Sequence, residues 1–253
     1  MRGKRIAAVV LTLALLAGLA VMAAAKDATT IVKESFDYMR GKASISTCTM
    51  LIHRPDWQRS MTIKAWTLGQ TDSIFYITEP PKDAGNGTLK KSSEMWMFNP
   101  KVNRVIKLPP SMMSQAWMGS DFSNNDLSKT DSLIKDYVHT LEKTATVKGK
   151  KVYFIKSMPK PNAPVVWGMQ KLQIREDHIF LQQDFYDEDI KLVKGLTMLD
   201  IKPMGGKLYP CKWRMQKADA KGEFTVVEYT KLEFKNSMPE SRFTLSNLRN
   251  PRD

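Results

Sequence analysis

The chain has 253 residues, and its 39 lysines and arginines against 26 aspartates and glutamates give a formal net charge of +13. The bases are spread along the chain without a dense block, which argues against a nucleic-acid-binding protein. The charge favours either an anionic membrane surface as partner or a basic surface that only aids solubility. The length beyond the first 25 residues suits one β-sandwich or barrel, so we expect a single domain over 26–253.

The first 25 residues have the pattern of a cleavable export signal. A basic stub over residues 2–5 precedes an apolar run over 6–22, which ends in the small residues Ala23 to Ala25. These are the three regions of a secretory signal peptide. Because no cysteine follows the run, we expect cleavage after Ala25 without lipid attachment. An uncleaved anchor is the alternative, since the apolar run is nearly long enough to span a bilayer.

A helix is expected at the start of the mature chain. Asp27 can cap it, and Ile31, Val32 and Phe36 recur at spacings that place them on one helical face. The helix is expected to run to about Arg40 and to lie on an apolar surface.

From residue 44 onward the pattern becomes that of β-strands. Short segments rich in β-branched and aromatic residues alternate with turn residues. The expected strands cover 44–53, 60–68, 73–79, 88–98, 103–108, 151–157, 167–176, 179–187, 191–202, 207–217 and 223–235. About eleven strands without a βαβ repeat predict a mainly β protein with one curved antiparallel sheet and a few helices.

Two segments interrupt the series of strands. Residues 111–127 show no alternation, yet they carry large apolar side chains that soluble proteins seldom place in connections. We interpret this segment as a lid, with the lid residues Met112, Met113, Trp117, Met118 and Phe122. Ser128 and Asp131 then match a capping box, and the apolar spacing that follows predicts a helix over 131–143.

Strand alternation assigns the apolar side chains to faces of the sheet. In 207–217, for example, Tyr209 and Trp213 lie opposite Lys212 and Arg214. For residues 88–98, alternation alone does not decide which of the two faces of the strand points inward. The candidate cavity residues are Met61, Ile63, Phe75, Ile77, Trp96, Phe98, Tyr209, Trp213 and Met215. Sixteen methionines suit either core filling or an adaptable apolar binding surface.

No catalytic or metal-binding motif is recognisable in the sequence. The three histidines stand apart from any ligand spacing, and we expect His139 and His178 at the surface. The Gly119-Ser120 pair does not continue as a nucleophile elbow. We therefore expect no enzyme, no catalytic residue, no metal and no cofactor.

The two cysteines, Cys48 and Cys211, have no second cysteine nearby, which excludes a redox pair or a cysteine-rich zinc site. A disulfide between them and two buried free thiols are both compatible with the sequence.

A resemblance to a known family rests on several motifs. They are Glu79-Pro80-Pro81-Lys82-Asp83-Ala84-Gly85, Met95-Trp96-Met97-Phe98-Asn99-Pro100, Arg104-Val105-Ile106-Lys107 and the G-S-D-F-S-x-x-D-L box over 119–127. With these motifs the chain resembles the outer-membrane lipoprotein-sorting (LolA-like) periplasmic carriers, in a divergent branch of uncharacterised members. The likeness extends from the first helix to Phe243-Thr244-Leu245.

The resemblance implies an unclosed antiparallel β-barrel, a half-barrel, with a helical plug over an apolar cavity. It also implies a periplasmic carrier that binds acyl chains of lipoproteins or other lipids, takes them from an inner-membrane transporter and passes them to an outer-membrane acceptor. The alternative is an envelope sensor or adhesin-type protein-interaction module on the same fold. That alternative predicts a cavity filled by the protein's own side chains.

Overall fold

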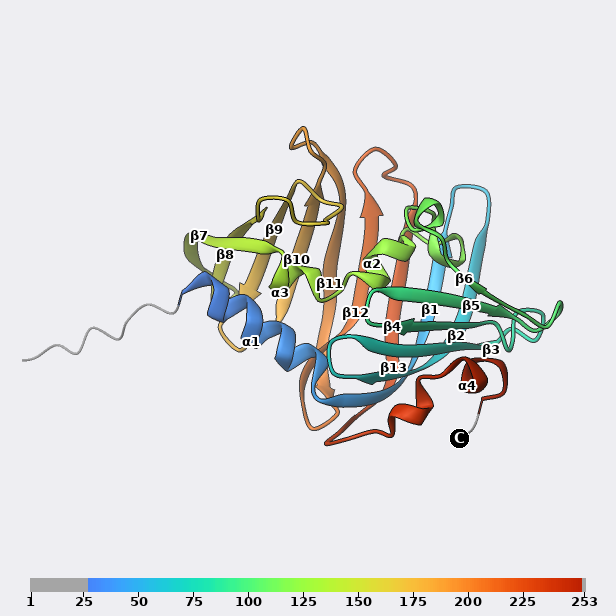
Figure 1. Ribbon diagram of the computed structural model, residues 1–253. Helices are drawn as coiled ribbons and strands as arrows, with labels where there is room; N and C mark the ends of the chain where they lie inside the picture. The colour runs from blue at the N-terminus through green and yellow to red at the C-terminus, as the bar shows by residue number, and fades with distance from the viewer. Residues whose placement is uncertain (1–26, 252–253) are drawn as a thin grey trace, which may run out of the picture.

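The computed structural model describes residues 27–251, and within this range the chain forms one antiparallel sheet of 13 strands with four α-helices and three 3₁₀ helices. Figure 1 shows the sheet curling around an open side, across which α1 (Ala28–Arg40), α2 (Asn124–Ser128) and α3 (Ser132–Lys135) lie. The expected mainly β class, with an unclosed antiparallel sheet, is confirmed. The expected export signal over residues 1–25 lies outside the described residues.

The strands agree with most of the predicted ranges. They are β1 (Ala43–His53), β2 (Gln58–Leu68), β3 (Asp72–Glu79), β4 (Gly87–Lys91), β5 (Glu94–Asn99), β6 (Arg104–Lys107), β7 (Tyr137–Val147), β8 (Lys150–Pro159), β9 (Met169–Arg175), β10 (Phe180–Tyr186), β11 (Leu192–Met204), β12 (Lys207–Lys217) and β13 (Phe224–Lys235).

The strand order explains why a helical segment covers the open side. The order across the sheet is β6-β5-β4-β3-β2-β1-β13-β12-β11-β10-β9-β8-β7, so the first and last strands pair in the middle. The two edge strands, β6 and β7, are consecutive in the chain. Residues 108–136, here called the strap, must therefore pass from one edge of the half-barrel to the other. The strap contains α2, α3 and the 3₁₀ helices η1 (Pro110–Met112) and η2 (Trp117–Gly119).

The first helix forms as its sequence predicts. The Asp27 carboxylate accepts a hydrogen bond of 3.0 Å from the Thr30 amide, which satisfies one of the free N–H groups of the first turn. Ile31 and Val32 are buried and pack with residues of β8 and β9. Gly41, at a φ of 66° that favours glycine, ends the helix. Within residues 27–251, no helix has both the length and the apolar character needed to cross a membrane.

The prediction of a helix over residues 131–143 is wrong. The helical part ends at Lys135 in α3, and residues from Tyr137 onward form edge strand β7, paired with β8. Tyr137 and His139 are buried while Val138 and Thr140 are exposed, which is the alternation of a strand. Pairing with β8 overrides the local helical spacing. His139 is consequently buried, 2.8 Å from the Ser157 hydroxyl, and not at the surface.

The strand predicted over 88–98 is two strands. Ser92, at a φ of 55°, turns the chain between β4 and β5, which pair as a hairpin. Because no glycine lies in this turn, the sequence gives no clear signal that the strand is interrupted here. This hairpin and β7 account for the difference between the eleven strands expected and the 13 observed.

Two faces of the sheet carry separate apolar clusters. On the inner face, Met61, Ile63 and Ile77 pack with the strap. On the outer face, Ile74 and Tyr76 pack with the C-terminal segment, which contains η3 (Glu240–Arg242) and α4 (Leu245–Arg249). Strict alternation along β3 separates these two sets. The cavity therefore belongs to the inner face alone.

Candidate functional site: an apolar cavity beneath the strap

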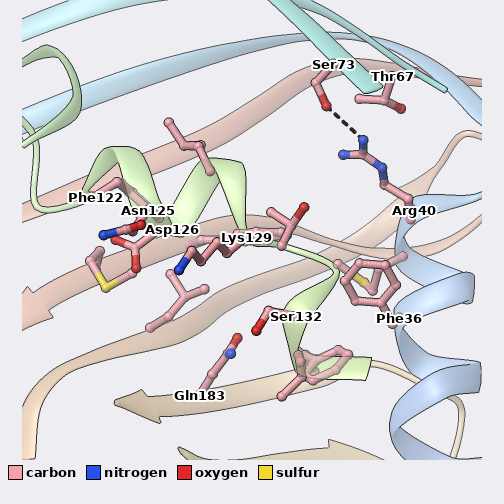
Figure 2. A pocket seen from close by; sticks show the side chains of 18 of the residues that line it. Phe36, Arg40, Thr67, Ser73, Phe122, Asn125, Asp126, Lys129, Ser132 and Gln183 are labelled. Carbon is pink, nitrogen blue, oxygen red and sulfur yellow. Dashed lines mark hydrogen bonds between the residues drawn. The ribbon is translucent and has the colours of Figure 1, made fainter. Parts of the chain in front are cut away.

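A cavity of about 320 Å³ lies between the inner face of the sheet, α1 and the strap. This is near the lower end of the roughly 300–1,000 Å³ that small-molecule pockets occupy. In Figure 2, Phe36 and Arg40 come from α1, while Phe122, Asp126 and Lys129 come from the strap, so that side chains from distant parts of the chain converge.

Most of the cavity wall is apolar. The large apolar side chains that line it come mainly from α1, the strap and five strands of the sheet, and they include Phe36, Met39, Phe75, Phe122, Leu127, Leu133, Phe180, Phe185, Leu196, Met198, Trp213, Met215 and Leu232. Such a wall offers no partner to a polar ligand group. It suits hydrocarbon, whose transfer from water stabilises a complex by about 25 cal/mol per Å² buried.

One end of the cavity is polar and carries a cation. Arg40, in the last turn of α1, donates from Nε to the Gly69 carbonyl at 2.7 Å, and from Nη2 to the Asp72 carbonyl at 3.0 Å and the Ser73 hydroxyl at 2.8 Å. Figure 2 shows Arg40 with Ser73 and Thr67 on one side of the pocket. These contacts fix the guanidinium at the cavity wall.

Further hydroxyl groups line the same end. Ser44 and Thr67 share a hydrogen bond of 2.8 Å, and both are buried. The rings of Tyr209 and Tyr229 meet edge to face at 5.5 Å, and burial raises the pKa of both phenols. Both therefore stay protonated at neutral pH and can donate hydrogen bonds.

A second polar patch lies on the far wall. Gln183 donates to Gln170 at 2.6 Å, and Tyr137 donates to the Trp167 carbonyl at 2.8 Å. Burial raises the pKa of Tyr137. In Figure 2, Gln183 lies across the pocket from Arg40. This patch carries no charge, whereas the charged side chains among the lining residues are Arg40 from α1 and Asp126 and Lys129 from the strap.

Polar contacts fasten the strap to the inner face. Arg54 makes a bidentate ion pair with Asp121, with both nitrogen–oxygen distances 3.1 Å. Asp121 also accepts from the Thr225 hydroxyl at 2.6 Å, and its side chain is fully buried. These contacts join the strap to the β1–β2 turn and to β13.

A second anchor lies five residues further along. Asp126 forms a capping box with Ser123 at the start of α2 and also pairs with Lys194 of β11. The Lys194 ammonium lies 5.1 Å from the Trp167 ring. The acidic and hydroxyl residues of the G-S-D-F-S-x-x-D-L box thus hold the strap in place and cap its helix.

The structure divides the candidate cavity residues into three groups. Four of them, Phe75, Tyr209, Trp213 and Met215, line the cavity. Three others, Met61, Ile63 and Ile77, face inward but lie in the cluster beneath the strap. The remaining two, Trp96 and Phe98, are in the outer-face cluster with Phe243 and Leu248. Along β5, Met95 and Met97 face inward instead. Alternation in the sequence could not decide between these two methionines and the two aromatic residues.

Among the lid residues, only Phe122 lines the cavity. Trp117 is buried, its ring nitrogen lies 3.2 Å from the Thr88 hydroxyl, and its ring meets Phe75 at 6.0 Å. Three methionines, Met112, Met113 and Met118, pack against the same inner cluster. This part of the strap is a plug beside the cavity, whereas residues 122–133 form the wall of the cavity.

Both cysteines are buried free thiols. Cys48 lies on β1 and Cys211 on β12, with β13 between these strands. Two strand spacings amount to roughly 10 Å, whereas bridged Cα atoms lie about 4.4–6.8 Å apart. No disulfide joins them.

Sequence reasoning missed Arg40 as a cavity residue. The available signal was its position four residues after Phe36, which places a charged side chain on the apolar stripe of α1. It also missed the polar residues Gln170 and Gln183, although Gln183 lies two positions before Phe185 on β10 and therefore shares its inward face.

A family model described as an uncharacterized protein matches residues 69–250 of the chain. The comparison with curated proteins gives no match.

Three solved structures share the fold. A DUF1329 family protein from Desulfovibrio piger has 22% sequence identity and a TM-score of 0.78, over 87% of this chain and 97% of that one. An outer membrane lipoprotein-sorting protein domain from Vibrio parahaemolyticus has 20% identity and a TM-score of 0.77, over 88% and 98%. A LolA superfamily protein from Nitrosomonas europaea has 21% identity and a TM-score of 0.73, over 88% and 99%.

Proposed function

Because the chain belongs to the family of uncharacterized proteins whose model matches residues 69–250, and has the fold of LolA-superfamily proteins, we propose that it is a periplasmic lipid carrier. In this proposal it binds an acyl chain of a lipoprotein or another lipid in the cavity beneath the strap. It receives this cargo at the inner membrane and releases it to an outer-membrane acceptor.

The observation that carries the proposal is the apolar cavity itself. Aromatic and aliphatic side chains line a hollow of about 320 Å³ in the half-barrel. Each methylene group of a bound chain contributes roughly 0.8 kcal/mol before ordering costs are subtracted. A chain of ten or more methylenes would therefore bind firmly without any covalent step.

The plug supports a carrier over the alternative of a protein-interaction module. In that alternative, the protein's own side chains fill the space under the strap. Trp117 and the methionines of the strap do fill the inner cluster near β2 and β3, but they leave the space between α1, β9–β12 and residues 122–133 open. In this proposal, the region of the inner face near β2 and β3 is a packed core, and the region near α1 and β9–β12 binds the ligand.

The export signal expected over residues 1–25 is part of the proposal. A carrier that crosses the periplasm must be released from the inner membrane, so cleavage after Ala25 is required. Mass spectrometry of the protein recovered from the envelope tests this point, because a chain that retains residues 1–25 would be tethered.

Native mass spectrometry of protein purified without detergent tests lipid binding directly. We expect a population that carries bound lipid and, after lipid removal, uptake of a fluorescent fatty acid. Consistent absence of both would count against a carrier. Retrieval of a protein partner by a protein that never binds lipid would favour the interaction module.

A pair of variants on one strand provides a matched control. Leu196 lines the cavity and is 6% exposed, whereas Leu199 on the same strand is 48% exposed. Leu196→Trp fills the cavity and should abolish fatty-acid uptake, while Leu199→Trp should leave it unchanged. Circular dichroism of both variants checks that the sheet is intact.

A further inference from the structure

The polar end of the cavity bears on the chemistry of the ligand. We propose that Arg40 and the hydroxyl groups around it bind the anionic head of a single-chain amphiphile, such as a fatty acid, whose chain lies along the apolar wall. This inference rests on the proposed function, since it names the ligand class of the same cavity.

Arg40 is a cation without a carboxylate partner. Its Nε and Nη2 atoms donate to two backbone carbonyls and one hydroxyl, all of them neutral. Among residues 27–251, no carboxylate lies within ion-pair distance of Arg40, and Nη1 has no hydrogen-bond acceptor. Arg40 is half-buried, and a charge withdrawn from water that meets only neutral acceptors would be stabilised by an anion that enters the cavity.

The neighbouring charges do not neutralise Arg40. Lys90 is 1% exposed, donates to the Thr71 carbonyl at 2.8 Å and lies 3.8 Å from Asp131. Asp131 also pairs with Lys135 at 2.7 Å. Asp72 offers Arg40 its carbonyl oxygen, while its carboxylate lies 3.4 Å from the Ser92 amide. Asp131 and Asp72, whose charges act on Arg40, thus have these other partners as well, and two cations, Arg40 and Lys90, lie near them.

The hydroxyl groups add hydrogen-bond donors suited to a carboxylate. Ser44 and Thr67, in mutual contact, together with Tyr209 and Tyr229, line the same end. Guanidinium and hydroxyl donors bind carboxylate or phosphate oxygens with short, charge-assisted hydrogen bonds. The hydrocarbon wall begins beside them, at Phe36 and Phe75. A ligand with both parts, an anionic head and one chain, satisfies both surfaces.

Titrations with three ligands test the inference: dodecanoate, dodecanol and acetate, added to lipid-free protein at about pH 7. The fluorescence of Trp167 and Trp213, which line the cavity, reports binding. We expect dodecanoate to bind about tenfold more tightly than dodecanol, as hydrogen bonds to a charged group suggest. Acetate should bind far more weakly than either.

Variants then locate the effect. Arg40→Gln should remove the preference for dodecanoate while leaving dodecanol affinity unchanged. Lys42→Gln, an exposed cation two residues away, should leave the preference intact. If Arg40→Gln unfolds, Tyr229→Phe is the second variant, which should reduce the preference without changing the charge of the cavity.

The outcomes separate this inference from the proposed function. Equal affinity for dodecanoate and dodecanol in the unsubstituted protein would overturn the inference and leave the carrier standing. A preference that survives both Arg40→Gln and Tyr229→Phe would also overturn it. Acetate binding as tight as dodecanoate would point to a free anion in place of an amphiphile. Binding of none of the three ligands would overturn the inference and count against the carrier as well.

Discussion

Arg54 and Asp121 form a bidentate ion pair that joins the β1–β2 turn to the strap, 67 positions apart in the sequence. The Asp121 side chain has no exposed surface, and that of Arg54 is 13% exposed. The strap, which covers the open side of the half-barrel, is thus held by a buried charge pair rather than by apolar packing alone.

Removing one partner of this pair should be costly. Asp121→Asn leaves the Arg54 guanidinium without its carboxylate in a largely buried site, and we expect the free energy of unfolding to fall by about 3 kcal/mol. Urea denaturation measures the loss. Glu223→Gln is the control, because Glu223 pairs with Arg54 at 3.4 Å but is 36% exposed, so less than about 1 kcal/mol should be lost. Equal losses in the two variants would contradict this role of Asp121.

Lys90 should make stability depend on pH. Burial lowers the pKa of Lys90 from 10.5 to about 8. Between these values the unfolded chain holds the proton more tightly than the folded one, so the contribution of Lys90 to the free energy of unfolding rises with pH. Relative to Lys90→Met, the unsubstituted protein should gain up to about 3 kcal/mol between pH 7 and 10.5.

Comparing unfolding curves of the two proteins at each pH cancels the titration of other groups. Lys91→Met is the matched control, since Lys91 is exposed and adjacent in the chain. A stability difference between Lys90→Met and the unsubstituted protein that stays constant with pH would show that Lys90 does not titrate in this window.

The thiols should be unreactive in the folded protein. Cys211 is 1% exposed, and burial raises the pKa of Cys48 to about 12, so the reactive thiolate is scarce at neutral pH. We expect iodoacetamide to label neither cysteine in the native protein and both after denaturation. Intact mass measured without reductant checks the free state, because a mass two hydrogens lower would reveal a disulfide.

Gly168 should not tolerate a side chain. A Cβ at this position would lie 2.3 Å from the Asp187 carbonyl oxygen and 2.8 Å from the Glu188 Cα, both of them backbone atoms. Gly168→Ala must therefore displace the β10–β11 turn, and we expect a loss of about 2 kcal/mol in thermal or urea unfolding. Gly222→Ala, whose Cβ would meet only Pro55 at 3.8 Å, should be close to neutral.

Local sequence signals predicted most of the secondary structure. The Asp27 cap and the spacing of Ile31 and Val32 predict α1, because all of these residues lie close together in the sequence, at the start of the helix. Alternation and turn residues likewise predicted most of the strands. Where a local signal conflicted with pairing, as after Lys135, the long-range partner β8 decided the outcome.

The candidate site was less accessible to sequence reasoning. Alternation determines which side chains share a face, and two of the candidates that it gave, Phe75 and Met215, are among the residues that line the cavity. It cannot distinguish an inward residue that lines a hollow from one that fills a packed cluster. Met61 is such a case, because the strap above it determines what it touches.

By itself the sequence determined the apolar character of the inner face and the resemblance to a carrier family, since both depend on residue types and their order. Only the tertiary structure decided where the cavity lies and what its polar end can bind. The strap has to cross between the edge strands β6 and β7, which sets its place over the open side. Arg40 and Ser73 meet at 2.8 Å because α1 lies across that same side, a proximity that their separation in the sequence does not reveal.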